Sequence, residues 1–181
     1  MKIVLATPLY PPDIAEPAVY SKELAKRLAL VHDVTIVTYG SLPEQIPGVR
    51  IVAINKRQPL LIRLFVYLIA LIKAVRSADL IYMQNGPSVE LPIAITQVFM
   101  RRPLVIHLGD NVARKFAAHH PMRTALEKFV IQRGSAVIEN APSPKPEILP
   151  FSAPPTIALE QWEESWTTHL QQLNNVFAYA T

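Results

Sequence analysis

Short runs of apolar residues recur between positions 2 and 139 and alternate with longer segments of helical periodicity. Runs that are apolar throughout, without strict alternation, are typical of strands buried on both faces of a sheet. Six segments have this character: 2–6, 33–38, 49–54, 79–83, 103–107 and 136–139. Helical patterns lie between most of them, at roughly 17–30, 60–76, 89–100 and 123–133. The alternation predicts an α/β fold, with a single Rossmann-like parallel sheet flanked by helices.

One connection in this pattern is unusually short. The segment "YGSLPEQIPG" joins the second and third predicted strands. A crossover between parallel strands through an ordinary helix needs about a dozen residues or more. We therefore expect one irregular connection, without a helix, in an otherwise regular sheet.

The composition changes after residue 141. Six of the fourteen residues from Pro142 to Pro155 are proline, which continues neither a helix nor a central strand. Beyond them, a stripe of apolar side chains recurs at helical spacing: Trp162, Trp166, Leu170, Leu173 and Phe177. These features predict a Rossmann-like lobe at 1–141, a proline-rich connector at 142–155 and an amphipathic helix at 156–181. We expect this helix to dock back on the lobe; the alternative is a helix reserved for a partner.

The stretch "LLIRLFVYLIALIKAV" at 60–75 is the most hydrophobic of the chain. Its uninterrupted apolar run, Leu64–Ile72, is nine residues long and lies between Arg63 and Lys73. A helix that spans a bilayer needs about 20 apolar residues. The stretch is therefore expected to be a packed crossover helix or an interfacial helix with Arg63, Lys73 and Arg76 at the headgroups, and the two roles can coexist.

Composition and charge exclude several kinds of chemistry. The chain of 181 residues has a net charge of +4 and no cysteine, which excludes disulfides, thiolate metal ligands and a cysteine nucleophile. A reducing, cytoplasmic compartment fits this composition, and the N-terminus has no signal-peptide pattern. The five histidines are scattered, and the adjacent His119 and His120 would point in different directions on a helix. We therefore predict no metal site, no cofactor and no nucleic-acid partner.

The turn after the first predicted strand, "TPLYPPDIAEPAV" at 7–19, contains no glycine. In nucleotide-binding α/β proteins, glycines in this turn let backbone amides approach a phosphate. Neither GxGxxG nor GxxxxGK[ST] occurs in the chain. The turn therefore does not have the usual form of a phosphate site.

The opening stretch "MKIVLATPLYPPDIAEPAVYSKELAKRLALVHDVTIVT" resembles the N-terminal lobe of family-4 retaining glycosyltransferases, whose two Rossmann-like lobes form the GT-B fold. The stretches "ADLIYMQNGPS", "RRPLVIHLGDNVARKF" and "FVIQRGSAVIENAPS" resemble the same lobe in the same order. Further on, "LEQWEESWTTHLQQLNNVF" is similar to the family's C-terminal helix, which crosses back onto the first lobe. The resemblance implies transfer of a sugar from a nucleotide-sugar to a glycan or lipid-linked acceptor, with retention at the anomeric carbon.

The chain departs from the family pattern in two places. Ala15 and Glu16 occupy the positions of a glycine pair in the family. The side chain of Ala15 would hinder the approach of backbone amides to a diphosphate, and the carboxylate of Glu16 would repel the diphosphate. Glu16 can equally be a favourable acid in the first turn of its helix. The family's second lobe, which binds the donor, has no counterpart in this sequence. The chain alone is therefore expected to be inactive.

Candidate site residues follow the predicted strands, because open α/β sheets bind ligands at the carboxyl ends of their strands. By resemblance His107 contacts the donor sugar and is a catalytic candidate, unless its ring is satisfied within the strand end. Asp110, the second catalytic candidate, could orient an acceptor hydroxyl or cap the following segment. The candidates for substrate binding are Tyr10, Glu16, Asn85, Gly86 and Gly109.

The sequence thus favours a glycosyltransferase N-terminal, acceptor-binding lobe of hexosyltransferase type. Its partner would be a glycan or lipid-linked acceptor. The protein would be cytoplasmic, with peripheral contact at the inner face of the membrane. The alternative is a non-catalytic interaction module that pairs with a separate donor-lobe chain. An unrelated nucleotide-binding Rossmann protein is disfavoured by the glycine-free first turn.

Overall fold

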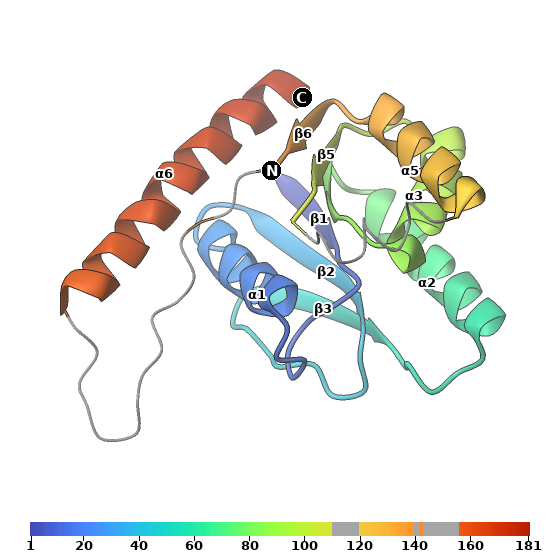
Figure 1. Cartoon of the computed structure of the whole chain (residues 1–181), viewed down its shortest axis with the longest axis horizontal. Helices are drawn as coiled ribbons and strands as arrows, with labels where there is room; N and C mark the ends of the chain where they lie inside the picture. The colour runs from blue at the N-terminus through green and yellow to red at the C-terminus, as the bar shows by residue number, and fades with distance from the viewer. Residues whose placement is uncertain (110–119, 140–141, 143–155) are drawn as a thin grey trace.

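Six parallel strands form one sheet at the centre of the computed structural model, which describes residues 1–109, 120–139, 142 and 156–181 (Figure 1). The strands are β1 (Lys2–Ala6), β2 (Asp33–Tyr39), β3 (Val49–Ile54), β4 (Leu80–Gln84), β5 (Leu104–His107) and β6 (Ala136–Ile138). Their order is β3-β2-β1-β4-β5-β6, and every neighbouring pair is parallel. The prediction of a single Rossmann-like parallel sheet is confirmed.

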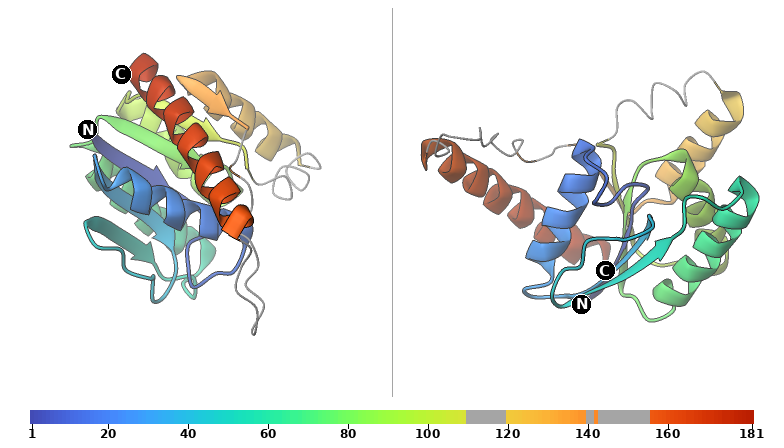
Figure 2. Two further views of the ribbon diagram at one scale, coloured as in Figure 1. Left: turned by 90° about the vertical axis from the view of Figure 1, so that its left-hand side faces the viewer. Right: turned by 90° about the horizontal axis from the view of Figure 1, so that it is seen from below.

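Helices cover both faces of this sheet (Figure 2). They are α1 (Glu16–Leu28), α2 (Leu60–Val75), α3 (Pro87–Phe99), α5 (Pro121–Arg133) and α6 (Thr156–Ala180). Successive strand residues point to opposite faces. In β1, Val4 therefore packs in the core below α2, α3 and α5, and Leu5 packs in the core below α1 and α6.

The connection from β2 to β3 contains no helix and joins two adjacent parallel strands, as the sequence predicts. Gly40 begins it, and its N–H donates a hydrogen bond to the Ile54 carbonyl oxygen at 2.9 Å. Gly48 closes it with φ of 76°, a left-handed conformation that favours glycine. Because β3 is first in the strand order, it is an edge strand, and α2 covers one of its faces.

The long helix α6 packs on the same face of the sheet as α1. Trp166, Leu173 and Phe177 are buried in the core below α1 and α6, and Trp162 and Leu170 are partly buried against it. Arg27 of α1 donates two hydrogen bonds of 2.9 Å to the carboxylate of Glu163. Its guanidinium carbon also lies 5.1 Å from the ring centroids of both Trp162 and Trp166. The predicted connector, apart from Pro142, lies outside the described residues.

The hydrophobic helix α2 is only partly buried. Tyr67, Leu71 and Val75 are fully enclosed, and the Tyr67 hydroxyl donates to the Val37 carbonyl oxygen at 3.0 Å. Leu61 and Phe65, in contrast, are 80% and 63% exposed. Among the helices of the described ranges, none is long and apolar enough to cross a membrane.

Candidate functional site

The carboxyl ends of β1, β4 and β5 lie side by side, because these three strands are consecutive in the sheet. Asn85, just after β4, donates its backbone N–H to the His107 carbonyl oxygen at 3.0 Å. A Cβ on Gly86 would lie 3.0 Å from Cγ of Pro8, which follows β1. The structure therefore brings together the loops that carry most of the sequence-predicted site residues. We call this region the carboxyl edge.

A buried polar network fixes the carboxyl edge from below. The side-chain oxygen of Gln84 accepts hydrogen bonds from Thr7 at 2.6 Å and from Ser21 at 2.7 Å. The Gln84 amide nitrogen donates to the Pro17 carbonyl oxygen, which also lies 2.8 Å from the Ser21 hydroxyl oxygen. The network ties β1, α1 and β4 together, so the loop between β1 and α1 is held at both ends. Sequence reasoning did not find it, since three common polar residue types at distant positions carry no local signal.

The two candidates from the first loop lie in different environments. Tyr10 is buried, and its hydroxyl donates to the Glu44 carbonyl oxygen at 3.0 Å. Burial, reinforced by the negative charge of Glu44, raises the pKa of the Tyr10 phenol to about 12. Glu16 is the exposed first residue of α1, where an acid is favourable next to the helix N-terminus. The structure thus places Tyr10 within the loop's packing and Glu16 at its surface.

His107 ends β5 on the face that carries α1 and α6, and only 2% of it is exposed. Its ring stacks on Tyr20 with a centroid distance of 4.5 Å, and it lies 6.2 Å from the ring of Tyr82. A Cβ on Gly109 would come within 2.5 Å of Cε1 of His107. The two predicted residues are therefore in direct contact, with Gly109 exposed above a buried imidazole. Asp110 lies outside the described residues.

Hydrogen bonds link this aromatic cluster to α6. The Tyr20 hydroxyl lies 2.7 Å from the Tyr82 hydroxyl and 2.8 Å from Nε2 of His169. Burial lowers the pKa of His169 to about 4, so its imidazole is neutral at pH 7. The stripe of apolar residues indicated the docking face of α6, but nothing in the sequence marked His169 as part of it.

A buried carboxylate, Glu90, also adjoins the carboxyl edge. It lies in the first turns of α3, is 4% exposed, and its Oε1 accepts the Gly86 N–H at 3.2 Å. Burial raises the pKa of Glu90 to about 7 against the opposing effect of this hydrogen bond; Glu127 raises it further and Arg123 lowers it. Sequence reasoning missed this residue, although an acid at the start of the otherwise apolar "PSVELPIAI" was a signal that could have found it.

Glu16 places a carboxylate in the first turn of the helix that begins at the carboxyl edge, where its negative charge would repel a phosphate. Of the candidates that follow β4 and β5, Asn85 and Gly86 are buried and Gly109 is exposed. Across the part of the chain that the structure describes, no group of three or more His, Asp or Glu side chains could hold a metal ion.

The chain matches no protein-family model and no curated protein. Its fold is similar to that of Alr3699/HepE from Anabaena, whose crystal structure in complex with UDP and glucose gives a TM-score of 0.53 at 19% sequence identity. That match covers 91% of this chain and 41% of Alr3699/HepE. The complex of the same protein with UDP-glucose gives a TM-score of 0.53 over 91% of this chain and 40% of the other. The chain thus spans about two fifths of the length of the protein it is similar to and shares the fold of that part.

Proposed function

We propose that this chain is the acceptor-binding lobe of a glycosyltransferase with a GT-B architecture, of the retaining, family-4 type. One observation carries the proposal: the sheet and its helices match the fold of about two fifths of Alr3699/HepE, a protein crystallised with UDP and glucose. The sequence resemblance supports it, since the quoted motifs occur along the lobe in family order. In the complete enzyme, a donor lobe would supply the nucleotide-sugar and this lobe would position the acceptor.

The acceptor would bind at the carboxyl edge. Gly109, which is exposed, would offer its backbone groups to the acceptor hydroxyls. Asn85 is 1% exposed and the Gly86 N–H is donated to Glu90, so these two residues would contact the acceptor only after the loop that follows β4 rearranges. His107 and Asp110 remain the proposed catalytic pair. Because His107 is enclosed by Tyr20 and Gly109, the proposal requires the Gly109 backbone to move before a sugar can contact the imidazole.

The proposed acceptor is a glycan or a lipid-linked sugar, as in polysaccharide biosynthesis. A lipid-linked acceptor would bring the protein to the cytoplasmic face of a membrane, so peripheral membrane contact is part of the proposal. The acceptor-binding lobe itself would need no metal or cofactor.

An alternative function is a non-catalytic module that pairs with a separate donor-lobe chain. The specific observation in its favour is the coverage of Alr3699/HepE, which leaves about three fifths of that protein without a counterpart here. The side chains of Ile14 and Leu42, in the loops after β1 and β2, are 97% and 83% exposed and could contact such a chain.

Two measurements on the purified chain test these proposals. Calorimetry with UDP-glucose should show no binding at low micromolar affinity, because the donor lobe is absent and Ala15 and Glu16 replace the glycine pair. Amide chemical shifts recorded with a panel of mono- and disaccharides should then change at Asn85, Gly86 and Gly109. Tight UDP-glucose binding would contradict the acceptor-lobe assignment.

The pattern of sugar responses separates the two functions. A response at the carboxyl edge to one class of saccharide supports acceptor binding. If no saccharide binds, and the product of an adjacent reading frame forms a defined complex with the chain, the interaction module is correct instead. A sugar-transfer assay of that complex, with His107→Gln as the comparison, then tests the proposed role of the imidazole.

A further inference from the structure

One side of α2 presents an apolar strip to solvent. Leu61, Ile62 and Phe65 are 80%, 53% and 63% exposed. Val66 and Ile69 continue the strip, with 37% and 38% exposed. Positions separated by three and four residues lie on one face of a helix. A contiguous exposed strip of large apolar side chains marks an interaction surface, whereas single exposed apolar residues are ordinary.

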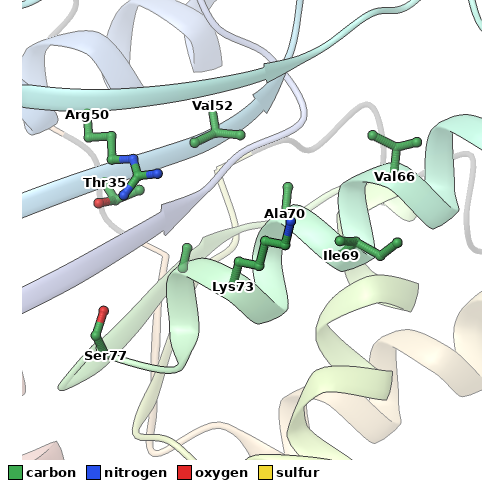
Figure 3. Close-up of a pocket in the computed structure, with 9 residues that line it drawn as sticks. Thr35, Arg50, Val52, Val66, Ile69, Ala70, Lys73 and Ser77 are labelled. Carbon is green, nitrogen blue, oxygen red and sulfur yellow. The ribbon is translucent and has the colours of Figure 1, made fainter.

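A pocket of about 330 Å³ opens beside this strip, between α2 and the edge strand β3 (Figure 3). Val66 and Ile69 belong to both the strip and the pocket, so the two features are continuous. Val52, Ala70 and Ala74 complete the apolar part of the lining. Thr35, Arg50, Lys73 and Ser77 make up the polar part.

The two charged side chains that line the pocket are both positive. Arg50 comes from β3 and Lys73 from α2, on opposite walls of the pocket (Figure 3). Among the described residues that line the pocket none is acidic, and within the described ranges neither cation makes an ion pair with a carboxylate. The α2 sequence contains no Asp or Glu, and the exposed Arg57 and Arg76 flank its two ends. Cations next to an apolar surface complement an anionic, amphipathic partner.

We propose that the pocket and the α2 strip bind an anionic phospholipid at a membrane surface. Arg50 and Lys73 hold the headgroup phosphate, with Thr35 and Ser77 as hydrogen-bond donors beside them. The first part of an acyl chain lies along Val66 and Ile69. Leu61 and Phe65 insert among the neighbouring lipids. This inference rests on the peripheral membrane contact of the proposed function, and it names the lipid class and the residues that bind it.

The proposed lipid site is separate from the carboxyl edge, but the α2 strip connects the two regions. Thr35 and Arg50 lie in the first halves of their strands and Ser77 precedes β4, so the polar end of the pocket is at the opposite edge of the sheet. Since α2 runs from the end of β3 back to the start of β4, its exposed strip leads from the pocket toward the carboxyl edge. A membrane bound along the strip would therefore lie near the proposed acceptor site, as a lipid-linked acceptor requires.

Vesicle flotation of the full chain tests the proposal. The chain should float with vesicles of phosphatidylcholine mixed with phosphatidylglycerol and stay unbound with pure phosphatidylcholine. The double variant Arg50→Gln/Lys73→Gln should lower the partition coefficient about thirtyfold, the effect expected for two cations at an anionic surface. Phe65→Ser should lower it about tenfold through loss of buried apolar area.

Matched control variants distinguish a defined lipid site from nonspecific electrostatic attraction between the basic protein and the anionic vesicle. Lys26→Gln/Lys128→Gln removes the same charge from exposed positions on α1 and α5 and should change the partition about twofold or less. Tyr179→Ser removes an 86% exposed aromatic ring from α6, on the other face of the sheet, and should have no effect. Equal losses in the test and control variants would overturn the site.

Two further outcomes would also overturn the proposal. Binding of inorganic phosphate at Arg50 and Lys73 in calorimetry, with no vesicle bound, would identify an anion site unrelated to membranes. A dimer in light scattering that Phe65→Ser converts to a monomer would assign the strip to a second copy of this chain. Failure of sugar transfer leaves the flotation result unaffected, so this proposal and the proposed function fail separately.

Discussion

The hydroxyl oxygen of Tyr20 lies 2.8 Å from Nε2 of His169, which joins the first helix of the chain to the last across 149 positions. The same hydroxyl is 2.7 Å from that of Tyr82 in the sheet. Three segments distant in sequence therefore share one buried hydrogen-bonded group. Trp166 stacks on Tyr20 at a centroid distance of 5.5 Å and covers this group. The helix α6 thus completes the packing of the lobe.

Truncation of the docking residue Trp166 should destabilise the whole lobe. Trp166 is 3% exposed, and removal of a large buried aromatic side chain costs about 3–5 kcal/mol. The unfolding midpoint of Trp166→Ala in urea should fall sharply. Tyr179→Ala, on the exposed side of the same helix, should change the free energy of unfolding by about 0.5 kcal/mol or less. A chain lacking 156–181 should be insoluble or molten; a soluble deletion variant with an unchanged cooperative transition would mean that α6 is reserved for a partner.

Acid should weaken the docking of α6 through His169. Burial lowers the folded-state pKa of His169 to about 4, below the ordinary value of 6.5 in the unfolded chain. The unfolded state therefore binds more protons, and the stability that neutral His169 contributes is complete above pH 6.5 and is lost as the pH falls toward 4. The loss is up to about 3 kcal/mol.

The measurement is the free energy of unfolding of the wild type and of His169→Gln between pH 7.5 and pH 4. Part of the acid sensitivity of the wild type should disappear in the variant. His32→Gln provides the control, because burial also lowers the pKa of His32 and its own contribution must be separated. If the two variants and the wild type lose stability in parallel, His169 does not control the docking.

Glu90 should produce the opposite pH dependence. Burial raises its folded-state pKa to about 7, so between pH 4.5 and pH 7 the folded state binds more protons than the unfolded state. The contribution of the protonated carboxyl is complete below pH 4.5 and is lost as the pH rises through 7, by up to about 3 kcal/mol. Glu90→Gln should therefore raise the stability relative to wild type more at pH 8 than at pH 5. Glu164→Gln, at an exposed position, should show no such difference, and equal effects of Glu90→Gln at both pH values would contradict the role of burial.

The contact between Gly109 and His107 should make a methyl group costly. A Cβ at position 109 would lie 2.5 Å from Cε1 of an imidazole that is held by its stacking on Tyr20. Gly109→Ala should lower the free energy of unfolding by about 1–3 kcal/mol, as expected for overpacking. Gly40→Ala, where nothing lies within 4 Å of the new Cβ, should be nearly neutral. Relief of the cost in Gly109→Ala/His107→Ala, measured as a double-mutant cycle, would identify the clash as its cause.

The pattern along the chain determined most of the fold. Strands that are apolar throughout, such as 2–6 and 33–38, indicate burial on both faces, and their alternation with helices indicates a parallel sheet. The ten-residue segment "YGSLPEQIPG" between the second and third strands is too short for a crossover helix and contains Pro43 and Pro47, so the sequence alone indicated an irregular connection. The apolar stripe of α6 showed which side of that helix is covered. These are local properties, because the periodicity of a segment is set by the geometry of its own backbone.

Only the tertiary structure decided which polar groups meet. Gln84 with Thr7 and Ser21, and Tyr20 with His169, are brought together by strand order and helix docking, and no spacing along the chain encodes them. The same applies to His107, whose place at the end of a strand was visible in the sequence while its enclosure by Tyr20 was not. Hydrophobicity alone could not divide α2 into a buried side and an exposed one, because nearly every position of that helix is apolar. The packing of neighbouring elements, and not the composition of the helix, left Leu61 and Phe65 facing water.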